Sequence, residues 1–341
     1  MTAPAPAPAA ALLATGPWWF GGAGIGNLGR AVPEERALAT VDAAWDAGVR
    51  GFDTAPHYGL GLGERRLGAA LAGRPRAAFR VSTKVGRTLV PHRPGADGPA
   101  DDLANGFAVP ALHRRLWDVT RDGVERSLAA SLERLALTHV DIAYLHDPDE
   151  YDPATAAPGG PGSPAAALEA GLEALAALRD AGAVRAVGVG SKSVAALTAA
   201  VRTGLADVLM VAGRHTLLEQ PAAPLLRECA RQGVAVVAAG VFNSGALSRP
   251  APDPSLPYEY GPMPDTVYQR VVAIGAVCAR HGVDLPTAAL AFPLLAPAVT
   301  TVAVGAQSPE QVRENATRAG IPVPPALWDD LHAAGLLDTL T

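Results

Sequence analysis

Four side chains that can carry or move a proton stand close to the ends of apolar runs. Asp53, Lys84 and His146 each end such a run, and Tyr58 follows shortly after Asp53. A nearby ammonium favours a phenolate, so Lys84 is expected to lower the pKa of Tyr58 by about 1 to 3 units. A carboxylate keeps a lysine charged, and an imidazole can donate to a substrate oxygen. This set suits proton transfer at a carbonyl or alcohol oxygen during hydride transfer.

Each member of the set also has an ordinary structural explanation. Asp53 could cap a turn, Tyr58 could pack as an aromatic, and His146 could be a hydrogen-bonded structural histidine. Lys84 is harder to explain in this way, because an unpaired charge inside a protein is costly. The sequence offers no activated serine or cysteine nucleophile, and its two cysteines lack metal-ligand spacing. The combination therefore favours an enzyme without a metal site.

Short apolar runs alternate with helical patterns along most of the chain. The runs alternate poorly between apolar and polar residues, which is typical of strands covered on both faces. The expected strands are Trp19–Ala23, Gly51–Ala55, Phe79–Lys84, Val140–His146, Arg185–Gly190, Asp207–Ala212, Val234–Ala239 and Thr300–Val304. The expected helices are Glu34–Ala47, Glu64–Ala72, Arg121–Leu135, Ala165–Ala181, Ser193–Thr203, Pro221–Gln232 and Val267–His281. Six glycines just past helices indicate left-handed caps, namely Gly48, Gly73, Gly182, Gly204, Gly233 and Gly282.

This alternation predicts either a doubly wound open sheet or a (β/α)8 barrel. A dinucleotide-binding open sheet would place a glycine-rich turn directly before a helix, whereas Gly24–Gly29 is separated from its helix by Arg30–Pro33. We therefore expect a single-domain (β/α)8 TIM barrel over residues 17–341. Three long segments that follow strands, 85–120, 147–164 and 242–264, are expected to be functional loops without secondary structure on the carboxyl-end face.

The composition excludes several classes of partner. The 341 residues are 49% apolar and 18% charged, with a formal net charge of −5 and no basic stripe, which argues against nucleic-acid binding. No apolar run reaches the roughly 18 to 20 residues that a membrane span needs, so no membrane partner is expected. Residues 1–16 are rich in alanine and proline without a basic start, which predicts a disordered leader rather than a signal peptide. We expect a cytoplasmic monomer or small homo-oligomer.

The order of the motifs resembles that of a known family. The segment D-T-A-P-H-Y at 53–58 resembles the D-T-A-x-x-Y motif of aldo-keto reductases, and S-T-K at 82–84 and L-H at 145–146 resemble two of their strand ends. The resemblance runs from about residue 20 to residue 315. It implies a (β/α)8 barrel with Asp53, Tyr58, Lys84 and His146 as catalytic residues. Tyr58 would be the general acid in reduction and the general base in oxidation.

Further segments resemble the aldose 1-dehydrogenase branch of that family. They lie at 144–149, 212–220 and 241–245. The resemblance implies oxidation of a sugar hemiacetal at C1, as in L-fucose, D-arabinose or L-galactose, to a lactone with hydride transfer to a nicotinamide. Alternatives are a pyridoxal 4-dehydrogenase type of enzyme or a general aldehyde or ketone reductase. From another class, the chain could be a catalytically weak nicotinamide-binding regulatory subunit.

The cofactor is expected at two loops late in the chain. Ser308 is expected to N-cap a helix that starts at Pro309. The resemblance implies that this loop holds the adenosine end, with Glu310 or Asn315 near the adenine, and that the loop at 242–245 holds the pyrophosphate. The expected cofactor residues are Ser191, Phe242, Asn243, Ser244, Gly245, Gly305, Ala306, Gln307, Ser308, Glu310, Gln311 and Asn315.

The same loop bears on the choice between NAD and NADP. NADPH-selective relatives carry lysine or arginine there to neutralise the 2′-phosphate, whereas this chain has Gly305, Gln307 and Gln311. Arg313 is the only cation nearby in the sequence. NAD is therefore favoured over NADP.

The nicotinamide end departs from the family pattern. A serine-lysine pair at 191–192 replaces the usual serine-asparagine pair, and Ala212 stands at the usual glutamine position. Ser191 is the expected carboxamide contact, and either Phe242 or His215 is expected to cover the ring. Candidate residues of the substrate pocket are Trp19, His57, Phe107, Trp117 and His215.

Overall fold

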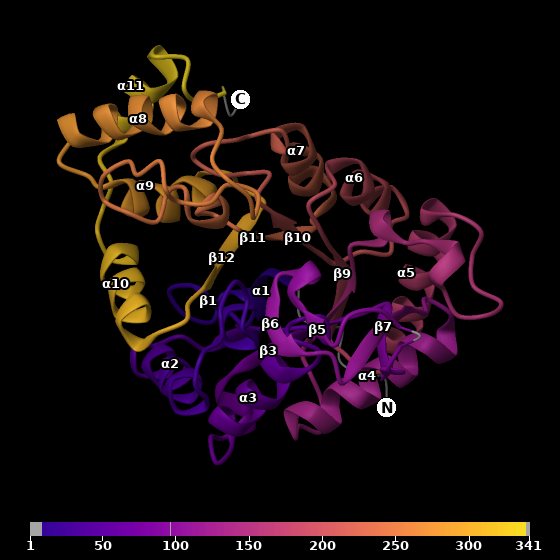
Figure 1. The fold of residues 1–341 in the computed structure, drawn as a ribbon. Coiled ribbons are helices and arrows are strands. Elements are labelled where there is room, and N and C mark those ends of the chain that lie inside the picture. Colours follow the sequence, from indigo (N-terminus) through magenta and orange to yellow (C-terminus); the bar gives the residue numbers. More distant parts are fainter. Residues whose placement is uncertain (1–8, 96, 339–341) are drawn as a thin grey trace.

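A closed barrel of eight parallel strands forms the centre of the molecule. The structure is a computed structural model and describes residues 9–95 and 97–338. The strands follow one another around the barrel in the order β1-β12-β11-β10-β9-β8-β3-β2 (Figure 1). They are β1 (Trp19–Gly21), β2 (Gly51–Asp53), β3 (Arg80–Val85), β8 (Ile142–His146), β9 (Ala186–Ser191), β10 (Val208–Ala212), β11 (Ala235–Ala239) and β12 (Val299–Gly305). The predicted TIM barrel and its eight strands are confirmed.

Helices cover the outside of the barrel. The seven predicted from the sequence are α2 (Glu34–Asp46), α3 (Leu62–Leu71), α4 (Arg121–Leu135), α5 (Pro164–Asp180), α6 (Val194–Arg202), α7 (Ala223–Gln232) and α8 (Asp265–Arg280). A further helix, α10 (Pro309–Ala319), follows β12, while α9 (Leu285–Ala291) and α11 (Pro325–Ala333) were not expected. All six predicted cap glycines adopt a positive φ, between 68° and 84°. Figure 1 shows α8 and α11 side by side at one edge of the molecule.

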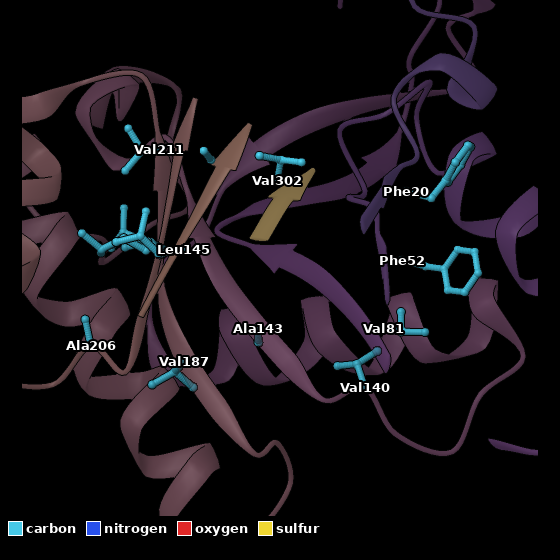
Figure 2. Packing of buried hydrophobic residues seen from close by; sticks show 14 of the residues in the cluster. Phe20, Phe52, Val81, Val140, Ala143, Leu145, Val187, Ala206, Val211 and Val302 are labelled. Carbon is cyan, nitrogen blue, oxygen red and sulfur yellow. The ribbon is translucent and has the colours of Figure 1, made fainter. Parts of the chain in front are cut away.

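The main apolar core lies between the strands and these helices (Figure 2). Phe20 and Phe52 from neighbouring strands are fully buried, with ring centroids 6.3 Å apart, and Phe79 continues the row. Burying one such side chain stabilises a fold by about 1.5–3 kcal/mol relative to leaving it in water. This layer fixes β1, β2 and β3, whose carboxyl ends carry or precede the proton-handling residues.

A short helix closes the amino end of the barrel. In α1 (Ala9–Leu13), Leu12 and Leu13 are buried and join Trp19 and Tyr144 in the interior cluster. The indole Nε1 of Trp19 donates to the carbonyl oxygen of Leu13 at 2.9 Å. The expectation of a disordered leader over 1–16 is therefore wrong for this helix, because its two leucines find an apolar surface. Residues 1–8 lie outside the described part of the chain.

The segment after β3 contains ordered strands, which corrects the expectation of a loop without secondary structure at 85–120. β4 (Arg87–Pro91) pairs antiparallel with β7 (His113–Trp117), and β5 (Asp101–Asp102) pairs with β6 (Phe107–Pro110). The segment begins at the carboxyl end of β3, so it stands over the face where barrel active sites form. Within residues 9–95 and 97–338, no helix combines the length and the hydrophobicity needed to cross a membrane.

Candidate active site

A buried ion pair forms the base of the site. Asp53 ends β2, Lys84 lies near the end of β3, and their side chains are 4% and 2% exposed. Lys84 Nζ donates to Asp53 Oδ2 at 2.6 Å and to the carbonyl oxygen of Thr54 at 3.0 Å. Ser82 Oγ donates to the other carboxylate oxygen at 2.7 Å. Both charges are therefore fully engaged, as buried charges must be.

Tyr58 lies directly against this pair. The Lys84 Nζ atom is 4.6 Å from the centroid of the Tyr58 ring. The turn that follows the tyrosine depends on Gly59, which has a φ of 63° and whose Cβ, if present, would lie 2.2 Å from the carbonyl oxygen of Gly26. The close approach of two backbone segments thus sets the position of the phenol.

Burial dominates the ionisation of the phenol. It raises the pKa of Tyr58 to about 12, although the ammonium of Lys84 acts in the opposite direction. The expectation that Lys84 would lower this pKa overall is wrong for the free protein, because removing a phenolate from water costs more than the nearby charge returns. Burial lowers the pKa of Lys84, but Asp53 and Tyr58 outweigh it, so the net shift is upward and the lysine stays charged.

His146 completes the group as a neutral imidazole. Its ring centroid lies 5.9 Å from that of Tyr58, and the two rings are nearly perpendicular. Burial, together with the charges of Arg87 and Lys84, holds the pKa of His146 well below its usual value. Its Nε2 is 3.4 Å from Asp147 Oδ2, and Arg87 binds that same carboxylate oxygen at 2.8 Å. The four expected catalytic side chains therefore meet at one rim of the barrel.

Three expected pocket residues, His57, Phe107 and Trp117, lie near this group. The His57 ring is 5.4 Å from that of His146 and 5.3 Å from that of Phe107, perpendicular to both. Trp117 is half-buried, 5.7 Å from the ring of Tyr151, and the guanidinium of Arg87 lies over it. The segment after β3 therefore supplies one wall of the site.

Two other expected pocket residues lie elsewhere. Trp19 pairs with Gly51 at the start of β2 and packs with Leu13, so it fills the amino end of the barrel rather than the rim. His215 is 1% exposed and stacks on Phe292, with ring centroids 5.0 Å apart. Burial lowers the pKa of His215 to about 4. The structure brings neither residue to Tyr58.

The loop after β12 adopts the predicted cap. Ser308 Oγ accepts a hydrogen bond from the backbone N–H of Gln311 at 3.3 Å, and Pro309 occupies the first position of α10. The Gln307 side chain turns away toward the β1–α2 segment, donating to the carbonyl oxygen of Leu28 at 2.6 Å and accepting from Arg30 Nε at 2.9 Å. Ala306 and Asn315 are buried, and Gly305 is exposed.

The structure adds two cations to this loop. Besides Arg313, the Arg30 and Arg36 side chains reach it, and Arg36 Nη2 lies 3.2 Å from Glu310 Oε2. The expectation that Arg313 is the only nearby cation is therefore wrong. Sequence reasoning had no signal for these contacts, since more than 270 residues separate each pair of partners.

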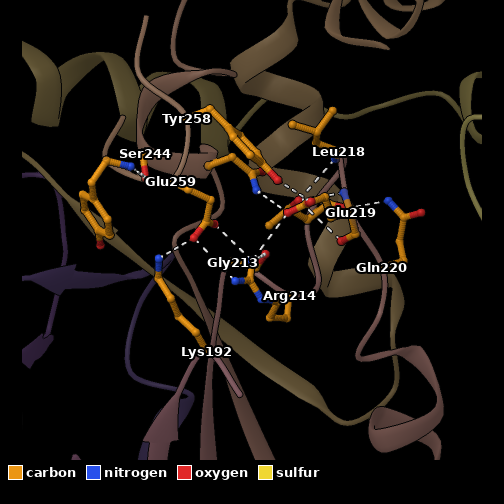
Figure 3. Close-up of polar contacts among 12 residues, drawn as sticks. Lys192, Gly213, Arg214, Leu218, Glu219, Gln220, Ser244, Tyr258 and Glu259 are labelled. Atoms are coloured by element: carbon orange, nitrogen blue, oxygen red, sulfur yellow. Dashed lines mark hydrogen bonds and ion pairs between the residues drawn. The ribbon is translucent and has the colours of Figure 1, made fainter. Parts of the chain in front are cut away.

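A second polar cluster lies where segment 242–264 crosses the rim (Figure 3). Glu259 accepts from Lys192 Nζ at 2.7 Å and from Arg214 Nη1 at 3.0 Å. Asn243 Nδ2 donates to Glu219 at 3.2 Å, and the Ser244 hydroxyl accepts from the N–H of Tyr260 at 3.3 Å. We call this segment the strap. It carries the four residues expected at the pyrophosphate, 242–245.

Ser191 lies at the carboxyl end of β9 with a defined orientation. Its hydroxyl donates to Asp149 Oδ1 at 2.6 Å and accepts from the N–H of Ser193 at 2.8 Å. One lone pair of the hydroxyl oxygen is still free to accept from an amide. Lys192 next to it points to Glu259 on the strap, a partner that the sequence did not indicate.

Comparisons with known proteins agree with this geometry. A sequence model of the aldo/keto reductase family matches residues 18–334. The chain is 46% identical over 340 residues to D-threo-aldose 1-dehydrogenase from Pseudomonas sp, covering 99% of this chain and 100% of that protein. It is 33% identical over 331 residues to pyridoxal 4-dehydrogenase from Microbacterium luteolum, covering 93% of each.

Solved structures support the fold. The holo form of an aldo-keto reductase from Bacillus halodurans matches with a TM-score of 0.68 at 22% identity, covering 94% of this chain and 92% of that one. The family match confirms the expected oxidoreductase class and implies a nicotinamide cofactor. The chain belongs to the aldo/keto reductase family.

Proposed function

We propose that this enzyme oxidises C1 of an aldose, in its cyclic hemiacetal form, to a lactone with NAD as the hydride acceptor. The observation that carries the proposal is the half-buried Tyr58 phenol next to the charged Lys84 and the neutral His146. The 46% identity to D-threo-aldose 1-dehydrogenase, over the full length of both chains, supports an aldose as the substrate class.

Each side chain has one task in this reaction. Tyr58, as the phenolate, takes the proton of the anomeric hydroxyl, and Lys84 stabilises that phenolate while Asp53 keeps the lysine charged and in place. His146 is neutral and donates a hydrogen bond to the oxygen on which charge develops. The nicotinamide, when bound, supplies the acceptor for the hydride from C1. Because burial raises the pKa of Tyr58, alkaline conditions favour oxidation.

Several features fit a dinucleotide. The Oδ1 atom of Asn243 is buried without a partner among the residues that the structure describes, which leaves an acceptor for a ligand amide or water. Ser191, at the carboxyl end of β9, keeps one lone pair without a donor among the described residues, which suits it to the carboxamide. Lys192 and Arg214, which pair with Glu259 in the free protein, would turn to a pyrophosphate bound at the strap and neutralise it. We propose that these residues, with the backbone of 242–245, hold the cofactor.

We propose NAD over NADP because Gly305, Gln307 and Gln311, the loop positions expected at the adenosine end, are uncharged. Of the two arginines that reach the loop from the β1–α2 segment, Arg36 is paired with Glu310, and the Nε of Arg30 is bonded to Gln307. Gly305 offers a clean test, since an added Cβ would meet nothing nearer than the carbonyl oxygen of Gly21 at 3.7 Å. Gly305→Arg should raise the NADP/NAD ratio of kcat/KM by about tenfold, the effect of one charge-assisted hydrogen bond. An unchanged ratio would refute the proposal.

The activity itself is tested with a substrate panel. L-fucose, D-arabinose, L-galactose and pyridoxal are each incubated with NAD or NADP at alkaline pH, and reduced nucleotide is measured. Tyr58→Phe is the matched control, because it removes only the phenolic oxygen. We expect aldose turnover in the wild type and a loss of about 10²- to 10⁴-fold in the variant.

Two other enzyme functions are separated by the same panel. The 33% identity to pyridoxal 4-dehydrogenase favours pyridoxal as the second candidate, and turnover of pyridoxal above all aldoses would establish it. Faster reduction of simple aldehydes than oxidation of any sugar would indicate a general reductase. Nucleotide binding by a wild type that turns over no faster than Tyr58→Phe would indicate a regulatory subunit.

A further inference from the structure

A side chain from the segment after β3 reaches across to the residue before Tyr58. Arg115 lies on β7, opposite Leu89 of β4, so the small antiparallel sheet determines where it points. Its Nε donates to the His57 ring at Nδ1, and its Nη2 donates to the His57 carbonyl oxygen at 2.9 Å. One guanidinium therefore holds both the ring and the backbone of His57.

Asp102 holds that guanidinium in place. Its two carboxylate oxygens accept from Arg115 Nη1 and Nη2, both at 2.7 Å. The Asp102 side chain is 5% exposed and that of Arg115 is 14% exposed. A bidentate pair of this kind fixes orientation as well as position. Four of the five N–H groups of Arg115 then have acceptors. These hydrogen bonds together fix the orientation of the guanidinium toward His57.

The contact decides which nitrogen of His57 carries the proton. Arginine stays protonated in proteins, so its Nε can only donate, and His57 Nδ1 must accept. Burial and the charge of Arg115 hold the pKa of His57 well below its usual value, so the ring is neutral. Its single proton is therefore on Nε2. Within residues 9–95 and 97–338, Nε2 has no hydrogen-bond partner and is not sealed from solvent.

The surroundings of the ring suit a hydroxyl ligand. His146, the donor expected at the reacting oxygen, is 5.4 Å away between ring centroids. Oxygens on adjacent carbons of a sugar are close enough to be bound by two donors at that separation. Phe107, at 5.3 Å, offers an apolar face for the C–H bonds of a sugar ring. The neutral N–H of His57, next to the apolar face of Phe107, suits a hydroxyl better than an anion.

We propose that His57 Nε2–H binds the hydroxyl on the carbon next to the reacting carbon, and that Arg115 and Asp102 are positioning residues that hold His57 in the donating tautomer. This inference rests on the proposed aldose function and assigns its substrate specificity. The segment after β3 thereby selects substrates that carry a hydroxyl next to C1. A bound substrate that lacks this hydroxyl would cover the Nε2–H group without pairing it, so the site discriminates against such substrates.

The first experiment tests the positioning without any substrate. The ¹⁵N resonances of histidine-labelled protein report the tautomer of His57, assigned by their loss in His57→Gln. We expect protonation on Nε2 in the wild type, and mixed tautomers with an upward shift of the His57 pKa in Arg115→Met. Arg114→Met is the matched control, since neighbouring residues of a strand point to opposite faces and Arg114 faces Asp97. An Nδ1-protonated His57, or an Arg115→Met spectrum identical to that of the control, would overturn the positioning role.

The second experiment tests hydroxyl recognition. D-arabinose and 2-deoxy-D-ribose differ only in the hydroxyl next to C1, and kcat/KM is measured for both with wild type and His57→Phe. We expect His57→Phe to lower kcat/KM for D-arabinose about tenfold or more, and that for the deoxy sugar by less than about threefold. The phenyl ring keeps the bulk of the imidazole, and a thermal-unfolding midpoint close to that of the wild type confirms folding.

The outcomes separate this inference from the proposed function. Equal losses on both sugars overturn the role of His57 while leaving aldose oxidation intact. A wild type that oxidises no aldose overturns the proposed function, and with it the role of His57 in sugar binding, whatever the tautomer. A loss confined to D-arabinose supports both.

Discussion

The molecule carries two charged clusters at one rim, and they differ in how far each is removed from water. In the barrel, the Asp53 and Lys84 side chains are 4% and 2% exposed, and their hydrogen-bond partners all belong to strands or strand ends. In the second cluster, the side chains of Glu259 on the strap and of its partners Lys192 and Arg214 are 25–34% exposed. The first cluster is fixed before any substrate arrives. The second can exchange its partners at little cost, which the proposed binding of an anionic cofactor at the strap would require.

The largest effect is expected when one partner of the buried Asp53–Lys84 pair is removed, which tests whether this cluster is as dry as the comparison assumes. Asp53→Asn leaves the Lys84 charge buried and unpaired, which should lower the free energy of unfolding by about 3–5 kcal/mol. Adding Lys84→Met removes the orphaned charge, so the double variant should regain most of that loss. Chemical denaturation of the wild type and the two variants measures both effects. If Asp53→Asn is as stable as the wild type, the Asp53–Lys84 pair is in contact with water.

The pH dependence of oxidation tests burial of the phenol. In the proposed reaction, the active form of Tyr58 is the phenolate, and burial raises the pKa of this side chain to about 12. The phenolate fraction therefore grows with pH, and kcat/KM for oxidation should rise about tenfold per unit from pH 7 to 10 without a plateau. His146 is neutral over this range and should add no transition of its own. A plateau near pH 8 would show that Lys84, rather than burial, sets the pKa in the working enzyme.

A smaller effect is expected at the strap. Glu259→Gln removes the charge that Lys192 and Arg214 share, but these groups remain in contact with water. The free energy of unfolding of Glu259→Gln should be lower than that of the wild type by about 1 kcal/mol or less. This difference from the wild type should be smaller still in high salt. Denaturation at low and high ionic strength checks this. A loss of the size expected for Asp53→Asn would erase the distinction between the two clusters.

The smallest effect is expected where a buried polar atom has no partner. The Tyr144 hydroxyl lies inside the barrel, fully buried, and is unpaired within the described part of the chain. Tyr144→Phe removes a desolvated group without breaking a hydrogen bond, so stability should stay within about 0.5 kcal/mol or rise. A thermal scan alongside the wild type is sufficient. A loss above about 1.5 kcal/mol would reveal an ordered water bound to this hydroxyl.

Local patterns in the sequence predicted the barrel and the four central residues of the site. Apolar runs such as Val140–His146 identify buried strands because both of their faces are covered, and carboxyl ends of neighbouring parallel strands meet at one rim. Lys84 was the most informative residue, since a lysine at the inner end of a strand requires a partner. The structure supplies Asp53, as expected.

Features that depend on distant segments could not be predicted in this way. The Arg115 contact with His57 joins residues 58 positions apart through an antiparallel sheet whose register no local pattern specifies. The contact between Arg36 and Glu310 spans nearly the whole chain. The pKa of Tyr58 was expected in the wrong direction because it depends on burial, which only the assembled barrel determines.

The α1 helix has a consequence for the order in which the molecule is assembled. Its leucines pack against β11 and β12, and β12 also pairs with β1, so a helix that precedes the first barrel strand docks onto the last two. The amino end of the barrel is therefore complete only when segments from both ends of the barrel sequence come together, and contacts between such distant segments form slowly. The indole of Trp19, which donates to the carbonyl oxygen of Leu13, would report this closure in its fluorescence.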